Sequence, residues 1–165
     1  MNPLRWSFRT AFAVAAAICA AFLGFAYYAQ FSMYLDPCPL CIFQRVAFIA
    51  LGLVCLVAAV HGPKGRGRKV YGVLALLAAG TGAAIAGRHV WLQHLPPDQV
   101  PDCGPGLSWM MDTLPLNAVI RKVFTGSGEC AKVDWTLLGL SMPEWTLIWF
   151  ALFVLGAAWY GFRRA

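Results

Sequence analysis

Four long apolar runs constrain the fold of this chain more than any other feature of its sequence. They cover residues 10–29, 42–60, 70–87 and 145–162 of a chain of 165 residues. Each run is close to the roughly 17–25 residues that an α-helix needs to cross a hydrocarbon core about 30 Å thick. Only helices and closed barrels satisfy their backbone hydrogen bonds in lipid, and uninterrupted apolar runs are typical of helices. We therefore predict an all-α membrane protein whose single domain is a four-transmembrane-helix bundle.

The charged residues indicate how this bundle is oriented. All seven acidic residues fall in two connections, residues 30–41 and 88–144. Basic residues gather before the first run, between the second and third, and after the fourth: Arg5, Arg9, Lys64, Arg66, Arg68, Lys69, Arg163 and Arg164. The positive-inside rule places both termini in the cytoplasm and the two acidic loops outside. Topology thus explains the net charge of +6, and we expect no nucleic-acid partner.

The first run has features of a secretory signal, because Arg5 and Arg9 precede an alanine-rich apolar stretch. Its apolar part, residues 10–29, is longer than the roughly 7–15 residues usual for a signal core. We expect it to remain as the first membrane helix.

The topology sorts the six cysteines into three pairs: Cys38 with Cys41 in the first outward loop, Cys103 with Cys130 in the second, and Cys19 with Cys55 inside spans. A bacterial periplasm is oxidising, so the four outward cysteines are interpreted as two disulfides. The two cysteines inside spans are interpreted as small apolar packing residues.

The segment Cys38-Pro39-Leu40-Cys41 lies at the mouth of the second run. This spacing lets two sulfur atoms bond across one turn, and a helix N-terminus favours the thiolate. Pro39 suits a first helical turn, so the helix is expected to begin within the motif. Arg45 follows Cys41 by one turn and can stabilise negative charge on the same face. The pattern predicts electron transfer between thiols and a compound dissolved in the membrane. An inert disulfide or a metal site is the alternative, but no two further ligands stand nearby at zinc spacing.

The second outward loop holds the other cysteine pair and a candidate interfacial helix. Pro/Gly-rich segments surround Cys103 and Cys130, so we expect this pair to be mobile and solvent-accessible, with a structural disulfide as the alternative. Apolar positions recur at helical spacing across residues 116–124, which predicts a short helix in the membrane interface or on the bundle end. His89, at the outward end of the third run, is either a surface group or a hydrogen-bond partner for an oxidant.

Several of these segments together resemble the disulfide bond formation protein B (DsbB) family. They run in family order: Cys38-Pro-Leu-Cys41-Ile-Phe-Gln-Arg45, His89-Val-Trp-Leu-Gln93, Cys103, Gly126-Ser-Gly-Glu-Cys130 and Trp135-Thr-Leu-Leu-Gly-Leu-Ser-Met-Pro-Glu-Trp145. Gln44 and Arg88 depart from the family pattern, which has acidic residues there in its best-known member. The first run matches only in character.

The resemblance implies a protein-disulfide:quinone oxidoreductase of the bacterial inner membrane. Its partner would be a DsbA-like periplasmic thiol oxidase, and its cofactor a membrane quinone, ubiquinone or menaquinone. DsbA would attack Cys103 of a Cys103–Cys130 disulfide, and electrons would reach Cys38–Cys41 through a Cys38–Cys130 link. Cys41 would deliver them to the quinone, assisted by Arg45 and His89.

Other classes of protein stay open from the sequence. A DsbB paralogue would serve a dedicated oxidase, and a relative of vitamin K epoxide reductase would send electrons the opposite way. A metal-binding or transport protein would use Cys38, Cys41 and His89 as ligands. A purely structural four-helix partner would hold two disulfides that do not react with a thiol oxidase.

Overall fold

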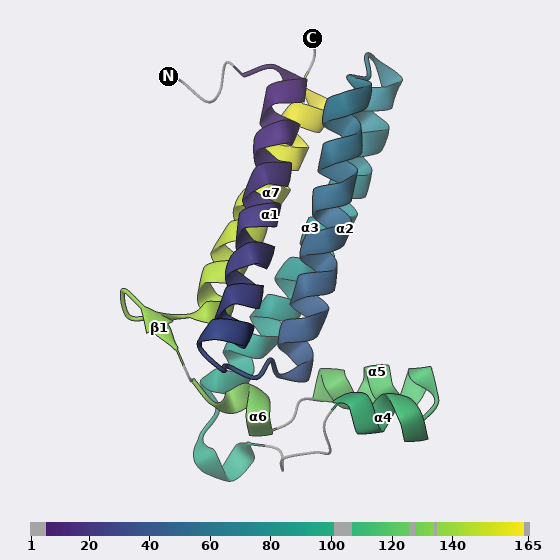
Figure 1. Ribbon diagram of the computed structural model, residues 1–165. Helices are drawn as coiled ribbons and strands as arrows, with labels where there is room; N and C mark the ends of the chain where they lie inside the picture. The colour runs from purple at the N-terminus through teal and green to yellow at the C-terminus, as the bar shows by residue number, and fades with distance from the viewer. Residues whose placement is uncertain (1–5, 101–106, 126–127, 134, 164–165) are drawn as a thin grey trace.

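The computed structural model describes residues 6–100, 107–125, 128–133 and 135–163. Four long helices run side by side, as Figure 1 shows: α1 (Phe8–Ser32), α2 (Pro39–His61), α3 (Arg66–Gln93) and α7 (Met142–Phe162). All four are long and apolar enough to cross a membrane. Each contains one predicted run, which confirms the four-helix membrane fold. The start of α1 and the end of α7 lie at the same end of the bundle (Figure 1).

Local signals set the ends of these helices. The Ser7 hydroxyl accepts a hydrogen bond from Thr10 N at 3.1 Å and caps α1, and Cys38 takes the same place before α2. Gly62 ends α2 in the left-handed conformation, with φ +59°. The third helix continues to Gln93, beyond the predicted end at residue 87. We attribute the extension to the buried His89, which faces the protein interior and not solvent.

Small residues allow the closest helix packing, between α3 and α7. A Cβ atom built on Gly72 would lie 2.8 Å from the Cα atom of Gly161 on the opposite helix. Farther along α3, a Cβ atom on Gly82 would overlap the ring of Phe150. That ring is fully buried and stacks on Phe48 of α2 at a centroid distance of 4.2 Å. Association inside lipid depends on such close packing, since lipid tails are as apolar as the helix surfaces.

The other end of the bundle, which the charge distribution predicts to face outward and which is called here the outward end, carries the shorter elements. These are η2 (Pro97–Gln99), α4 (Leu107–Thr113), α5 (Leu116–Thr125), α6 (Gly128–Ala131), β1 (Thr136–Leu137) and β2 (Leu140–Ser141). The α5 axis lies across the four long helices (Figure 1), as expected of an interfacial helix. Its Val119 is buried against the bundle end, while Leu116 and Arg121 are exposed. The predicted short helix is therefore present and also packs on the bundle.

A cluster of buried side chains joins these elements to α2 and α3. Its members are Leu40, Ile85, Leu92, Met110, Val119 and Cys130.

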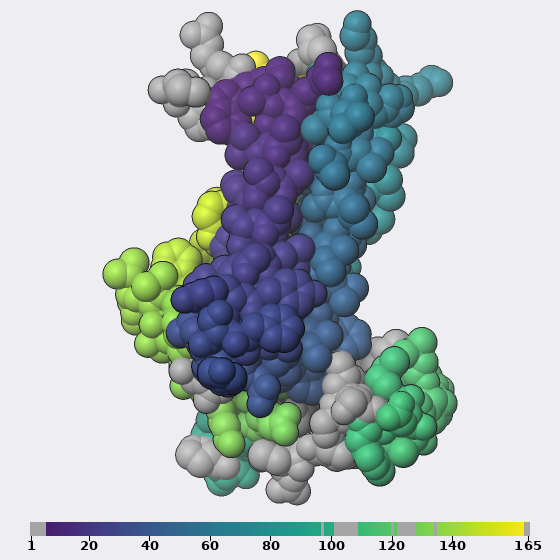
Figure 2. All heavy atoms as spheres, viewed as in Figure 1, coloured from purple at the N-terminus to yellow at the C-terminus, as the bar shows by residue number. Residues whose placement is uncertain are grey.

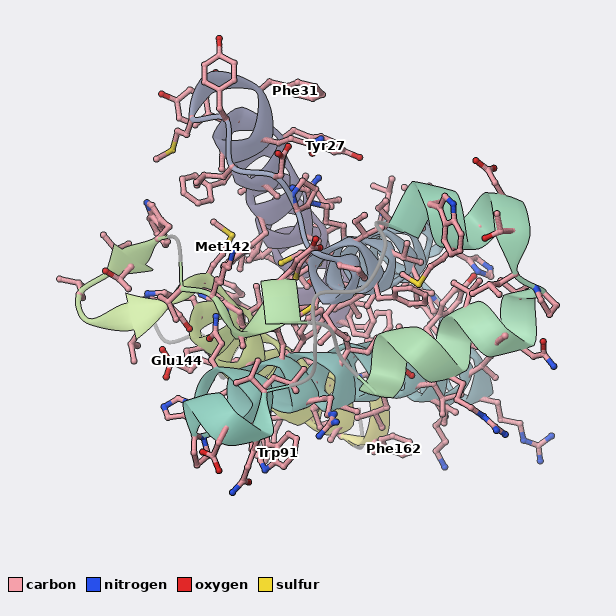
Figure 3. The ribbon with its side chains drawn as sticks, turned by 90° about the horizontal axis from the view of Figure 1, so that it is seen from below. Tyr27, Phe31, Trp91, Met142, Glu144 and Phe162 are labelled. Carbon is pink, nitrogen blue, oxygen red and sulfur yellow. The ribbon has the colours of Figure 1, made fainter. Side chains whose placement is uncertain are left out.

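In the view from the outward end, Tyr27 and Phe31 of α1 lie on one side of the bundle and Trp91 of α3 on the other (Figure 3).

The sequence interpretation did not include the β1–β2 hairpin. Leu138 and Gly139 form its two-residue turn with φ values of +55° and +81°, the positive values that a tight hairpin needs. Trp145 Nε1 donates to Leu137 O at 3.1 Å, and the Glu144 carboxylate accepts from Ser141 N at 2.6 Å. The hairpin projects from one flank of the outward end, and α4 and α5 from the other (Figure 2). Much of the Trp135–Trp145 motif thus shapes the entry of the chain into α7.

Candidate functional site

Three reactive side chains meet where α2 begins and α3 ends. Cys38 Sγ lies 3.1 Å from Cys41 Sγ and 3.7 Å from His89 Nε2. The sulfur–sulfur distance exceeds the about 2.05 Å of a disulfide, so the pair is present as two thiols. His89 is only 2% exposed, which removes the interpretation as a surface histidine. The fold thus joins a helix-start motif to a residue of a different helix.

The start of α2 positions both sulfur atoms. Cys38 is the N-cap residue, and its Sγ accepts from Cys41 N at 3.4 Å. Pro39 occupies the first turn, as predicted, where its missing N–H leaves no bond unmade. The sulfur atoms of Cys130 and Cys41, together with burial, raise the pKa of the Cys38 thiol. Cys38 therefore keeps its proton, and its thiol donates a hydrogen bond to Cys41 Sγ.

A buried hydrogen-bond chain orients His89. Gln44 Nε2 donates to His89 Nδ1 at 3.0 Å, and Thr146 Oγ1 donates to Gln44 Oε1 at 2.6 Å. All three side chains are buried, so each depends on its neighbours for hydrogen bonds. Since Nδ1 accepts, a neutral His89 carries its proton on Nε2, the nitrogen that faces Cys38. The imidazole can then donate to a sulfur atom or to a ligand beside it.

Arg45 connects α2 to α1. Its guanidinium donates to the Gln30 side chain and to Ala26 O, the latter at 3.1 Å. It also lies over the Tyr27 ring, 5.2 Å from the centroid. The arginine therefore holds the outward ends of two helices together while keeping a positive charge on the same helix as Cys41.

A cavity of about 830 Å³ opens beside these groups, and Cys38, Cys41, Arg45 and His89 all line it. Much of its wall is aromatic and comes from several parts of the chain: Phe22, Phe25, Phe48, Trp135, Trp145 and Trp149. Small-molecule sites typically have about 300–1,000 Å³, an apolar lining and a few convergent polar groups. The wall suits a lipid-soluble ring, and the polar groups suit oxygen atoms on that ring.

Cys130 of α6 lies beside Cys38, and its sulfur atom is one of the neighbours that raise the pKa of the Cys38 thiol. It is 1% exposed and packs with Leu40 and Leu92. The expectation of a solvent-accessible Cys130 is therefore wrong for this structure, since α6 packs against α3. Cys103 lies outside the described residues, so its pairing with Cys130 stays a prediction.

Comparisons with known proteins identify the family of this chain. The family model of disulfide bond formation protein DsbB matches residues 8–160. The chain is 51% identical over 165 residues to disulfide bond formation protein B of Xanthomonas campestris pv. campestris (strain 8004), covering 99% of this chain and 96% of that protein. The chain belongs to the DsbB family.

Two further DsbB-family relatives support the same assignment. The protein of Methylococcus capsulatus is 54% identical over 144 residues, with 87% of this chain and 88% of that protein covered. That of Nitrosococcus oceani is 51% identical over 156 residues, covering 94% and 92%. Membership confirms the resemblance seen in the cysteine motifs and implies disulfide oxidoreductase activity in a membrane.

Two polar residues of this DsbB-family site were missed by sequence reasoning. Gln44 stood out only as a departure from the family pattern, and Thr146 was not singled out. Both lie near the ends of spans, where a polar side chain that faces the bundle interior often marks a functional site. The position of these two residues near the span ends could be read from the sequence, but the side chains that they contact could not.

Proposed function

We propose that this protein takes electrons from a DsbA-like periplasmic thiol oxidase and passes them to a membrane quinone. One observation carries the proposal: Cys41 lines an aromatic cavity that also contains a guanidinium, an imidazole and its partner thiol. A quinone supplies an apolar ring that accepts two electrons and two protons. The dithiol supplies both electrons as Cys38 and Cys41 form a disulfide.

The chain's own residues have separate tasks in this proposal. Reduced DsbA attacks Cys103 of the Cys103–Cys130 disulfide, and Cys130 then bonds to Cys38 and displaces Cys41 as a thiolate. The second thiol of DsbA then displaces Cys103 and leaves as oxidised DsbA. The freed Cys103 attacks Cys130 of the Cys38–Cys130 link, which restores the Cys103–Cys130 disulfide and leaves Cys38 and Cys41 as a dithiol. Arg45 stabilises negative charge near Cys41, and His89 donates a hydrogen bond from Nε2. The neighbouring positions of Cys38, Cys41 and Cys130 support this order of exchange.

Redox energetics support a quinone as the final acceptor. The DsbA couple has an established potential of about −120 mV, whereas ordinary structural disulfides lie below about −300 mV. The difference of about 180 mV corresponds to about 8 kcal/mol for two electrons. Such a disulfide cannot reoxidise DsbA without a favourable downstream acceptor. A lipid-soluble quinone provides one at the depth of the cavity.

A direct assay tests the proposal. Purified protein is mixed with reduced DsbA and a soluble quinone, and quinone absorbance is followed while thiols are counted. We expect one quinone reduced for each DsbA disulfide formed. Electron flow from quinol to a disulfide substrate, without the forward reaction, would instead favour the type of enzyme related to vitamin K epoxide reductase.

Substitution of Cys41 gives the sharpest prediction. Cys41→Ser should reduce quinone only at the protein-free rate, because no thiol remains to complete the disulfide. Cys19→Ser is the matched control, since Cys19 is buried among core side chains away from the cavity lining. Normal turnover by Cys41→Ser would contradict the proposed electron path.

We further propose that the protein lies in the bacterial inner membrane with both termini in the cytoplasm. The outward elements around Cys38 and Cys130 then face the periplasm. The distribution of basic residues supports this orientation.

A further inference from the structure

We propose that the reduced form of this site binds a thiophilic divalent metal ion, with Cys38, Cys41 and His89 as ligands and Zn²⁺ as the expected occupant. The Sγ atoms of both cysteines and a ring nitrogen of His89 all lie within 4.8 Å of one another. Sequence spacing near the motif argued against a zinc site. The fold supplies the missing imidazole from α3.

The interatomic distances are close to those of a zinc centre. Typical Zn–S and Zn–N bonds of about 2.3 and 2.0–2.1 Å imply tetrahedral S···S and S···N edges of about 3.8 and 3.6 Å. The corresponding distances are 3.1 Å between the sulfur atoms and 3.7 Å from Cys38 Sγ to His89 Nε2. A side-chain rotation at Cys41 that lengthens the sulfur–sulfur distance by about 0.7 Å brings it to the tetrahedral edge. The fourth position faces the cavity that all three residues line.

The hydrogen-bond chain behind His89 can support metal binding. Ligation through Nε2 requires the proton on Nδ1. Rotating the Gln44 amide by 180° exchanges its oxygen and nitrogen, so that Nδ1–H donates to the oxygen and the nitrogen donates to Thr146 Oγ1. Thr146 then donates to Pro143 O, which lies 2.9 Å away. In either orientation of the Gln44 amide, the buried side chains of Gln44 and Thr146 and the Nδ1 atom of His89 keep a hydrogen-bond partner.

This property is specific to an amide at position 44. A carboxylate can accept from Nδ1–H and from the Thr146 hydroxyl, but it has no N–H to donate to His89 Nδ1 when that nitrogen is unprotonated. The glutamine therefore serves both states of His89. In the metal-free site Nε2 carries its proton and faces the Cys38 sulfur atom, and in the metal-bound site the Nε2 lone pair faces the ion.

Metal binding and disulfide formation exclude each other. Zn²⁺ displaces one proton from each thiol and binds two thiolates, with no change in oxidation state. A Cys38–Cys41 disulfide offers no thiolate and cannot hold the ion. Zinc would therefore hold Cys38 and Cys41 as thiolates and stop the reduction of quinone. A chelator that removes the zinc would restore quinone reduction. This consequence rests on the proposed function, whereas binding itself does not.

The test uses the full chain in detergent micelles, reduced and then freed of reductant, with no quinone or DsbA present. Zn²⁺ is titrated in competition with a chromogenic chelator. We expect one ion per chain, and an affinity at least about tenfold lower in Cys38→Ser, Cys41→Ser and His89→Gln. Gln44→Leu should lower it by about 10–100-fold, as removal of a partner behind a ligating histidine does.

Controls separate this site from other thiols. Cys19→Ser and Cys55→Ser should bind zinc as the unmodified chain does, since both cysteines are buried in the core cluster away from the site. Co²⁺ should give sulfur-to-metal charge-transfer absorbance that disappears with Cys41→Ser. Oxidising the unmodified chain should also abolish binding, which tests the site without any substitution.

Two results would overturn the inference. One is unchanged zinc affinity in His89→Gln or Cys41→Ser, and the other is equal affinity in the oxidised chain. A protein that reduces quinone but binds no zinc would contradict only this inference. A protein that binds zinc but reduces no quinone would contradict only the proposed function.

Discussion

At the scale of single residues, the site depends on polar side chains that are buried yet fully hydrogen-bonded. Gln44 and Thr146 hold His89 in place, and Arg45 is held by groups of α1. A buried polar group without a partner costs free energy, so these contacts stabilise the bundle as well as the site. Substitutions here are expected to separate binding effects from folding effects.

Arg45→Ala should raise the KM for quinone by about tenfold, the effect of losing one charge-assisted hydrogen bond of about 1.4 kcal/mol. Steady-state kinetics over a range of quinone concentrations measures this change. Arg88→Ala is the matched control, because Arg88 stacks on the Trp91 ring at 4.1 Å at the same end of the bundle. An unchanged KM in Arg45→Ala would leave Arg45 only as a connection between α1 and α2.

Gln44→Leu should lower the free energy of unfolding by about 1–3 kcal/mol, because it leaves the ring nitrogen of His89 without its buried donor. Denaturant titration in detergent measures the change. Thr81→Val should have an effect within about 0.5 kcal/mol, since the Thr81 hydroxyl is exposed and donates to Leu77 O of the same helix. Equal effects of the two substitutions would show that the chain through Gln44 contributes little stability.

At the scale of elements, helix spacing determines the shape of the bundle. The α3 and α7 backbones approach closely at Gly72 and Gly161, and the Phe150 ring lies against Gly82. The loop elements then rest on the ends of α2 and α3 through one apolar cluster. A change in helix spacing should therefore disturb both stability and the cavity.

Gly82→Ala should destabilise the protein by about 1–3 kcal/mol, because the added methyl group overlaps the buried Phe150 ring. Gly80→Ala, two residues earlier in α3, has no atom within 4 Å of the new methyl group. It should be neutral or stabilising by up to about 1 kcal/mol, given the higher helix propensity of alanine. Thermal unfolding of both variants in the same detergent makes the comparison, and a similar Tm would contradict tight α3–α7 packing.

At the scale of the whole molecule, the bundle is polarised. The turn between α2 and α3 lies at one end of the bundle, and the start of α2 and the end of α3 lie at the other (Figure 1). Cys38, Cys41 and His89 line the cavity at this second end. Under the proposed function, this separation would keep thiol exchange on one side of the membrane.

Cysteine labelling in cells tests the orientation. In a chain whose six cysteines are replaced by serine, Lys64→Cys should react with a membrane-impermeant reagent only after the cells are opened. Asp98→Cys, at the other end, should react once the periplasm is accessible. Both positions are exposed, so access to the reagent depends on the side of the membrane. The reverse labelling pattern would invert the topology and remove the proposed periplasmic partner.

The four spans were predictable from the sequence because hydropathy is a local property. The helix start at Pro39 was predictable for the same reason, since proline and the cysteine before it act on their own turn. The β1–β2 hairpin was not foreseen, because its strands have only two residues each and show no alternating pattern.

The site itself was decided by tertiary structure. The side chains of Gln44 and His89 are 45 residues apart in sequence, and those of Gln44 and Thr146 are 102 apart, yet each pair shares a hydrogen bond. No local pattern encodes such contacts, because they arise only when three helices pack at fixed rotations about their axes. The sequence alone determined the membrane fold and the family, and it predicted which cysteines react. Packing determined which polar groups face the sulfur atoms, and thereby the chemistry available to them.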